Sequence, residues 1–211
     1  MDTSKPVIQN IIFDLGGVML DLDVYRTYRA FEAIGFNQEE LINNKEHRKI
    51  FWQFEIGKLS PEEFCENIEL ALGRKVPSKT IENAWNAMIL GFKPEKIKFL
   101  QEINSGYRTF LLSNTNYFHE KVYSRMLTDT FGLSMSDIFE KHYYSHLLGM
   151  GKPDPEIFEH VLKENALIAG ETLFVDDSPQ HIQSAQKLGI QCLHFPVNGD
   201  LEKVLKYLKK I

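Results

Sequence analysis

The sequence predicts an α/β protein in which helices cover both faces of a parallel sheet and an all-α segment is inserted after the first strand. From residue 94 onward, short apolar runs alternate with helical patterns, which is typical of a parallel sheet. Between about residues 24 and 90, strand signals are nearly absent and apolar residues recur at spacings of three and four. The length of 211 residues suits one such domain with a small insertion.

The expected strands are short and rich in β-branched or other apolar residues, and we expect the first to be buried in the sheet. The first ends at Asp14 and is broken by the pair Gly16-Gly17. In chain order, the expected strands cover residues 7–13, 108–112, 142–145, 172–175 and 190–195.

Helix boundaries are marked by capping residues, prolines and glycines. Within the insertion, Ser60 precedes Pro61 and two glutamates, the combination that typically begins a helix. After the insertion, the expected helices cover residues 95–103 (stopped near Gly106), 116–127, a segment opened by Asp154-Pro155, 179–188 (ended by Gly189) and 200–210.

Composition excludes several classes of function. The net charge is −5 and the pI is about 5.8, so the basic excess of a nucleic-acid-binding protein is absent. Cys65 and Cys192 are far apart, which argues against a zinc site or a disulfide framework. Since there is neither an apolar leader at the start nor a run of about 18 apolar residues, we expect a cytoplasmic protein without membrane contact.

Polar side chains gather where the predicted strands end. They are Asp14, the pair Ser113-Asn114 and the pair Asp176-Asp177. The carboxyl ends of parallel strands meet at one ligand crevice, and three carboxylates there would repel one another without a cation. Oxygen ligands of this kind suit Mg²⁺. Lys152, in a turn before a helix, supplies positive charge for a phosphate group.

Four motifs resemble the signatures of the haloacid dehalogenase superfamily, in the family's order and over nearly the whole chain: IIFDLGGV, FLLSN, GKPDP and LFVDD. The resemblance implies a Rossmann-like core, which we expect over residues 1–23 and 91–211, and a helical cap, expected over residues 24–90. It further implies that the chain is an enzyme.

The resemblance also implies a role for each motif residue. Asp14 forms an aspartyl-phosphate that water hydrolyses, and Lys152 neutralises developing charge. Ser113 and the backbone of Asn114 contact the phosphoryl group. The expected metal ligands are Asp14, the Gly16 carbonyl, and Asp177 with Asp176 beside or behind it, and which of these two aspartates binds directly stays open.

One position departs from most phosphatases of this superfamily. They carry an aspartate two residues after the nucleophile to protonate the leaving group, whereas this chain has Gly16. The local patterns FDLGGVMLDLD, SNTNYFH and GKPDPEIF resemble bacterial phosphatases of glucose 1-phosphate, which also have glycine there. We therefore expect a magnesium-dependent phosphatase of small metabolites such as sugar phosphates, a monomer or homodimer, with its leaving-group acid unassigned.

Three other functions remain open. A metal-independent 2-haloacid dehalogenase would use the same aspartate on carbon, but it would not carry the pair Asp176-Asp177. A phosphomutase would need the acid that Gly16 lacks. A non-catalytic binding protein would not need Asp14 or Lys152, yet both are present.

Several further polar and aromatic residues have an ordinary structural interpretation. We expect Asp21 and Asp23 to solvate the hairpin after Asp14, and His142 and His146 to pack rather than bind metal. We expect Trp52, Phe54 and Trp85 to lie in the core of the cap, with stacking against a sugar as the alternative.

Overall fold

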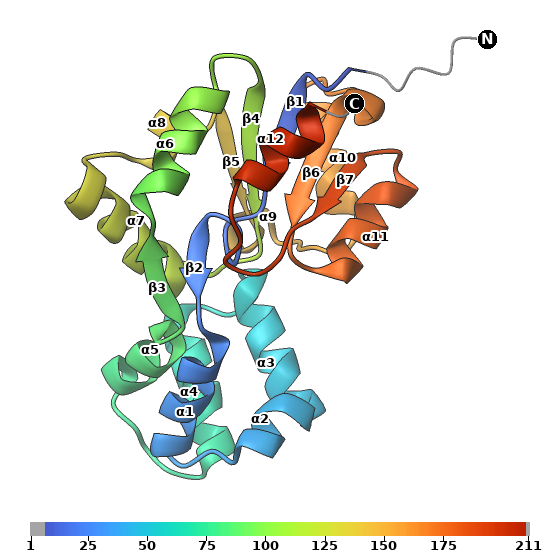
Figure 1. Cartoon of the computed structure of the whole chain (residues 1–211). Helices are drawn as coiled ribbons and strands as arrows, with labels where there is room; N and C mark the ends of the chain where they lie inside the picture. Colours follow the sequence, from blue (N-terminus) through green and yellow to red (C-terminus); the bar gives the residue numbers. More distant parts are fainter. Residues whose placement is uncertain (1–6, 210–211) are drawn as a thin grey trace.

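The computed structural model describes residues 7–209, and its centre is a parallel sheet of five strands (Figure 1). The strand order is β5-β4-β1-β6-β7, which places β1 between β4 and β6. The strands are β1 (Asn10–Phe13), β4 (Arg108–Ser113), β5 (Lys141–Tyr144), β6 (Thr172–Asp176) and β7 (Gln191–His194). All five predicted strands form, with ends that differ from the predicted ones by at most three residues.

Successive side chains of the central strands enter two different cores, because side chains alternate between the faces of a sheet. In β1, Ile11 and Phe13 contribute to one core and Ile12 to the other. The first core is covered by α6 (Pro94–Ile103), α7 (Tyr117–Phe131), α8 (Met135–Ile138) and α12 (Glu202–Leu208). The second is covered by α10 (Pro155–Glu164) and α11 (Pro179–Lys187). The predicted α/β fold with helices on both faces is thereby confirmed.

Some short elements of the structure were not among the expected ones. A short helix, α9 (Ser145–Leu148), and the 3₁₀ turn Ala169–Glu171 had no counterpart in the sequence analysis. The last predicted helix extends to residue 210, which lies outside the described residues. Among the helices of residues 7–209, each is too short or too polar to cross a lipid bilayer.

Five helices form the insertion, which lies beyond the ends of the strands in the lower part of Figure 1. They are α1 (Val24–Ala33), α2 (Gln38–Asn43), α3 (Lys45–Glu55), α4 (Pro61–Leu72) and α5 (Ser78–Asn86). The helix α4 begins as predicted, with a capping box between Ser60 and Glu63. Phe54 and Trp85 lie in the core of this helical unit, as expected.

A small two-stranded sheet joins the helical unit to the core domain. It pairs β2 (Leu20–Leu22) with β3 (Ile89–Phe92) in antiparallel orientation. The cap limits of 24 and 90 proposed from the sequence therefore fall beside or within this sheet, and they stay a prediction.

Asp21, on β2, is not a solvating residue, and that expectation was wrong. Its carboxylate is buried and accepts hydrogen bonds from Lys93 (2.6 Å) and Lys96 (2.7 Å). Burial opposes ionisation, but these two lysines hold the pKa of Asp21 below its usual range. Asp23 instead caps α1 through the backbone N–H of Tyr25. The ion pairs thus connect β2, the strand that leads into the cap, with the start of α6, the helix that follows the cap in the chain.

The cap is packed firmly against the core domain at two places. The ring of Phe118, on α7, packs into the cap core with its centroid 5.1 Å from that of Phe54 and 6.1 Å from that of Phe64. At the end of α3, Gly57 lies so close to His146 that a Cβ would overlap the His146 carbonyl oxygen. This second contact requires glycine, whose φ here is +68°.

We expect Gly57→Ala to destabilise the protein strongly, because the cap must move away from α9. A left-handed φ alone costs about 1–2 kcal/mol for a residue with a Cβ. Gly73→Ala is the matched control, since Gly73 has a φ of +66° but no atom within 4 Å of the added Cβ. Urea titrations should show an additional loss of about 2 kcal/mol or more for Gly57→Ala. Equal losses in the two variants would show that the contact with His146 is not tight.

Candidate active site

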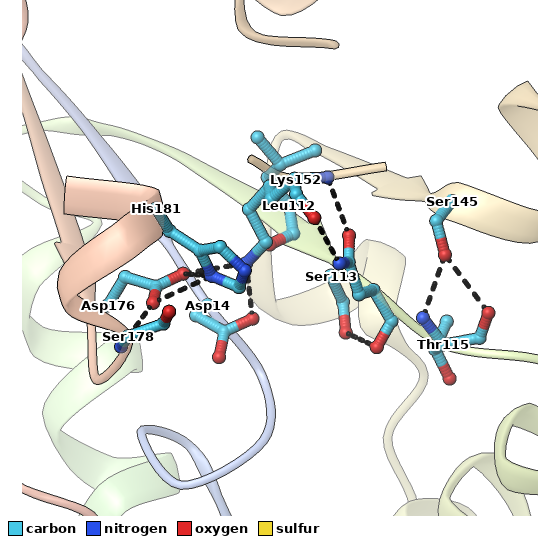
Figure 2. Close-up of polar contacts among 10 residues, drawn as sticks. Asp14, Leu112, Ser113, Thr115, Ser145, Lys152, Asp176, Ser178 and His181 are labelled. Carbon is cyan, nitrogen blue, oxygen red and sulfur yellow. Dashed lines mark hydrogen bonds and ion pairs between the residues drawn. The ribbon is translucent and has the colours of Figure 1, made fainter. Parts of the chain in front are cut away.

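Of the residues singled out at the strand ends, Asp14, Ser113 and Asp176 come together at the carboxyl end of the sheet (Figure 2). Asp14 follows β1, whose neighbours β4 and β6 end at Ser113 and Asp176. Asp14, Asp176 and Asp177 each place one carboxylate oxygen within 4.8 Å of the others. Within residues 7–209, this is the one group of three acidic, histidine or cysteine side chains so arranged.

Lys152 reaches this cluster from the turn before α10, and its side chain is fully buried. Its Nζ lies 2.7 Å from Asp14 Oδ1, 2.7 Å from Asp176 Oδ2 and 2.8 Å from the Leu112 carbonyl oxygen. Burial acts to lower the pKa of Lys152, but the two carboxylates raise it above its usual range. Lys152 is therefore held as a cation between Asp14 and Asp176.

Asp176 is saturated with hydrogen bonds. Besides Lys152, its carboxylate accepts from the Ser178 backbone N–H (2.7 Å) and from His181 Nδ1 (3.0 Å to each oxygen). Burial opposes ionisation, but Lys152 and His181 hold the pKa of Asp176 far below its usual range. The sequence analysis missed His181, whose only signal is its place in the first turn of the helix after the paired aspartates.

Asp14 is the carboxyl group of the cluster whose pKa is raised to near neutrality. Burial, reinforced by Asp176 and only partly offset by Lys152, raises the pKa of Asp14 to about 7. Burial and the charge of Asp176 also raise the pKa of Asp177. Three carboxylates thus meet one lysine, and a divalent cation is the natural complement.

The oxygens left free by this network fit a hard cation. Asp14 Oδ2 has no hydrogen-bond partner among the described residues, and the Asp177 carboxylate accepts no hydrogen bond from another described residue. Oxygen-only donors of this kind are those that Mg²⁺ prefers. The donor set therefore fits magnesium.

Asn114 acts on Lys152 through the backbone. Its Nδ2 donates to the Lys152 carbonyl oxygen (2.7 Å), and its Oδ1 accepts from the Lys152 N–H (2.9 Å). Ser113 is buried, and its Oγ donates weakly to the Asn114 carbonyl oxygen at 3.3 Å. Neither residue caps α7, because Asn116 fills that position. Ser113 and Asn114 thus stand beside Asp14 and Lys152, and their contact with phosphate stays a prediction.

The turn after Asp14 approaches Asp177 at Gly17. A Cβ on Gly17 would lie 2.7 Å from Asp177 Oδ2, and the φ of Gly17 is +74°. Asn198 fixes this turn, because its N–H donates to the Gly17 carbonyl oxygen (2.6 Å). The Asn198 side chain also binds both backbone groups of Leu22. The Gly16-Gly17 backbone is therefore held beside Asp177.

His142 and His146 pack as structural residues, as the sequence analysis expected. Tyr144 lies between them, with ring centroids 5.1 Å and 5.9 Å away. His146 Nε2 lies 2.8 Å from Glu120 Oε2, outside the carboxylate cluster.

Comparisons with known proteins agree with this geometry. A family model described as haloacid dehalogenase-like hydrolase matches residues 8–189. D-ribitol-5-phosphate phosphatase of Bacteroides thetaiotaomicron is 34% identical over 197 residues, which are 92% of this chain and 94% of that protein. A crystal structure of a HAD-family enzyme from the same organism, in complex with magnesium and inorganic phosphate, is 34% identical. It aligns with 93% of this chain and 98% of that chain, at a TM-score of 0.83.

A more distant similarity concerns the fold alone. L-2-haloacid dehalogenase of Xanthobacter autotrophicus is 18% identical, with a TM-score of 0.60, and the match covers 97% of this chain and 83% of that chain.

Proposed function

The chain belongs to the haloacid dehalogenase-like hydrolases, and from this premise we propose that it hydrolyses phosphate esters of small sugars or sugar alcohols through an aspartyl-phosphate on Asp14. It is a phosphatase of this family with magnesium as cofactor, and this part of the sequence-based expectation is confirmed. The observation that carries the proposal is the meeting of Asp14, Lys152, Asp176 and Asp177 at one strand edge.

The proposed reaction begins at Asp14. One oxygen of its carboxylate attacks phosphorus while the ester oxygen departs with the bonding electrons, and the other oxygen would remain for the metal. Water then attacks the phosphorus of the aspartyl-phosphate, and the bond to Asp14 breaks to release inorganic phosphate. Lys152 offsets the negative charge that grows on the phosphoryl group, and Ser113 donates a hydrogen bond to it.

We assign as metal ligands the oxygens that the hydrogen-bond network leaves without a partner. Asp14, Asp177 and the Gly16 carbonyl oxygen would hold Mg²⁺, whereas Asp176 holds Lys152 and His181. When bound, the cation supplies charge neutralisation at the carboxylates and the phosphoryl oxygens.

The substrate class rests on similarity and on the cap. The ribitol phosphate phosphatase points to a phosphorylated polyol, and the resemblance to glucose-1-phosphate phosphatases points to a sugar phosphate. The cap packs against the core domain, and Trp52 of the cap contacts Gly151 beside Lys152. A panel with magnesium should show cleavage of D-ribitol 5-phosphate or glucose 1-phosphate and poor cleavage of a folded phosphoprotein. Efficient release of phosphate from the phosphoprotein alone would refute this substrate class.

Gly16 adds a prediction about leaving groups. With no side-chain acid at this position, a poor leaving group loses assistance that is typically worth roughly 10²–10⁴-fold. A plot of log kcat/KM against leaving-group pKa, for esters of similar size, should therefore slope downward. Gly16→Asp should flatten the slope, because the new carboxyl group can protonate a poor leaving group. The added Cβ would lie 2.7 Å from the end of the Leu22 side chain, which can move aside. A flat line for the wild type would show that another group already donates the proton.

A further inference from the structure

One aromatic residue of the cap lies outside the cap core and against the catalytic turn. Gly151 precedes Lys152, and a Cβ on Gly151 would lie 2.6 Å from Trp52 Cη2 and 3.2 Å from Asn114 Oδ1. The absence of a side chain at Gly151 therefore lets the indole rest on this turn. Trp52 is partly exposed, unlike Phe54 and Trp85, so the expectation that it belongs to the cap core was wrong.

Glu55 is on the same face of α3, three residues after Trp52. Its backbone carbonyl oxygen accepts a hydrogen bond from Ser145 Oγ. The same hydroxyl accepts from the Thr115 N–H at 2.9 Å. Glu55 is thereby tied to the loop that follows Ser113 and Asn114. Side chains of a helix lean toward its N-terminus, so the Glu55 side chain leans toward Trp52.

The Glu55 carboxyl group has no partner in the protein. Among the described residues, no hydrogen bond or ion pair reaches its side chain. It is largely sheltered from solvent, and burial alone raises its pKa to about 7. Its oxygens are not among the buried polar atoms that lack a partner in the described part of the chain, so a ligand can reach them. A ligand that brings hydroxyl groups would satisfy them.

We propose that Trp52 and Glu55 form a recognition wall for the polyhydroxylated carbon chain of the substrate. The indole face packs against C–H groups, and the carboxylate accepts hydrogen bonds from hydroxyl groups. This inference rests on the proposed phosphatase function. It concerns the carbon chain of the substrate, which the phosphate-binding residues do not contact. Trp52 and Glu55 are specificity residues that touch the substrate away from phosphorus.

The test compares two esters on Glu55→Ala and Glu55→Gln. D-ribitol 5-phosphate carries hydroxyl groups, whereas phenyl phosphate carries none. Because a hydrogen bond to a charged group is worth about 10- to 100-fold in kcat/KM, Glu55→Ala should lose that factor on D-ribitol 5-phosphate. The loss on phenyl phosphate should be at least about fivefold smaller. Trp52→Ala should raise KM for both esters, since the indole packs against either carbon skeleton.

Glu46→Ala is the matched control, because Glu46 is an exposed glutamate in the first turn of the same helix. It should keep wild-type values on both esters. Glu55→Gln should not lower Tm, since no hydrogen bond of the side chain is lost. Equal losses of kcat/KM on the two esters in Glu55→Ala would overturn the proposal. So would a greater loss on a third ester, phosphoethanolamine, which carries an amine in place of hydroxyl groups, than on D-ribitol 5-phosphate.

Calorimetry separates this proposal from the phosphatase function itself. Binding of D-ribitol 5-phosphate to the Asp14→Asn protein should weaken about 10- to 100-fold when Glu55→Ala is added. That result, with no ester cleaved by the wild type, would retain the wall and reject the phosphatase function. If the wild type cleaves the ester but binding does not depend on Glu55, the phosphatase function is retained and the recognition wall is rejected.

Discussion

Asp14→Asn is expected to abolish turnover of every ester that the wild type cleaves, with a fall in kcat of at least about 10⁴-fold. An amide cannot attack phosphorus to form an acyl phosphate, so the reaction loses its first bond-forming step. The fold should survive, because Lys152 keeps its contacts with Asp176 and the Leu112 carbonyl oxygen. Stopped assays of phosphate release, together with Tm, measure both effects.

Asp129→Asn is the matched control for this change. Asp129 is exposed on α7, where it pairs with Arg125 at 3.1 Å, far from the cluster along the chain. Its activity should equal that of the wild type. If Asp14→Asn retained more than about a tenth of wild-type kcat, the nucleophile would be another group, since a lost nucleophile costs far more.

Removal of magnesium is expected to have the second largest effect. A chelator should lower kcat/KM by about 10³-fold, and added Mg²⁺ should restore it, because charge stabilisation by a cation is worth several kcal/mol. The physical reason is the excess charge of three carboxylates around one lysine. Burial, together with the charge of Asp176, already raises the pKa of Asp14 to about 7.

Asp177→Asn should raise the Mg²⁺ concentration needed for half-maximal activity more than it raises KM at saturating Mg²⁺. The Asp177 carboxylate accepts no hydrogen bond from another described residue, so its loss should act mainly on the metal. Full activity in chelator would instead favour the metal-independent dehalogenase chemistry.

Much of the fold follows from local sequence patterns. The central strands are buried on both faces, so they appear as uninterrupted apolar runs whose ends are marked by polar residues. Parallel pairing then brings Asp14, Ser113 and Asp176 to one edge without further information. Lys152 lies at no strand end, and it was predicted from its place in a turn before a helix and from the motif GKPDP.

The remaining features depend on contacts between distant segments. Asp21 finds Lys96 across 75 positions of sequence, so its burial has no local signal. The place of Trp52 is set by the missing side chain of Gly151, 99 positions away, and not by its own helix pattern. The contact of His181 with Asp176 is local, at five positions apart, but it depends on the direction in which α11 leaves β6, which the sequence pattern does not specify.

The stereochemical course at phosphorus tests the central claim most directly. A phosphorothioate ester that carries two different oxygen isotopes on phosphorus can be hydrolysed in water of the third isotope, and the configuration of the released chiral thiophosphate determined. An aspartyl-phosphate on Asp14 requires two in-line displacements, each of which inverts phosphorus, so the account predicts net retention of configuration. Net inversion would mean that water attacks the ester directly, and it would contradict the role of Asp14 as nucleophile.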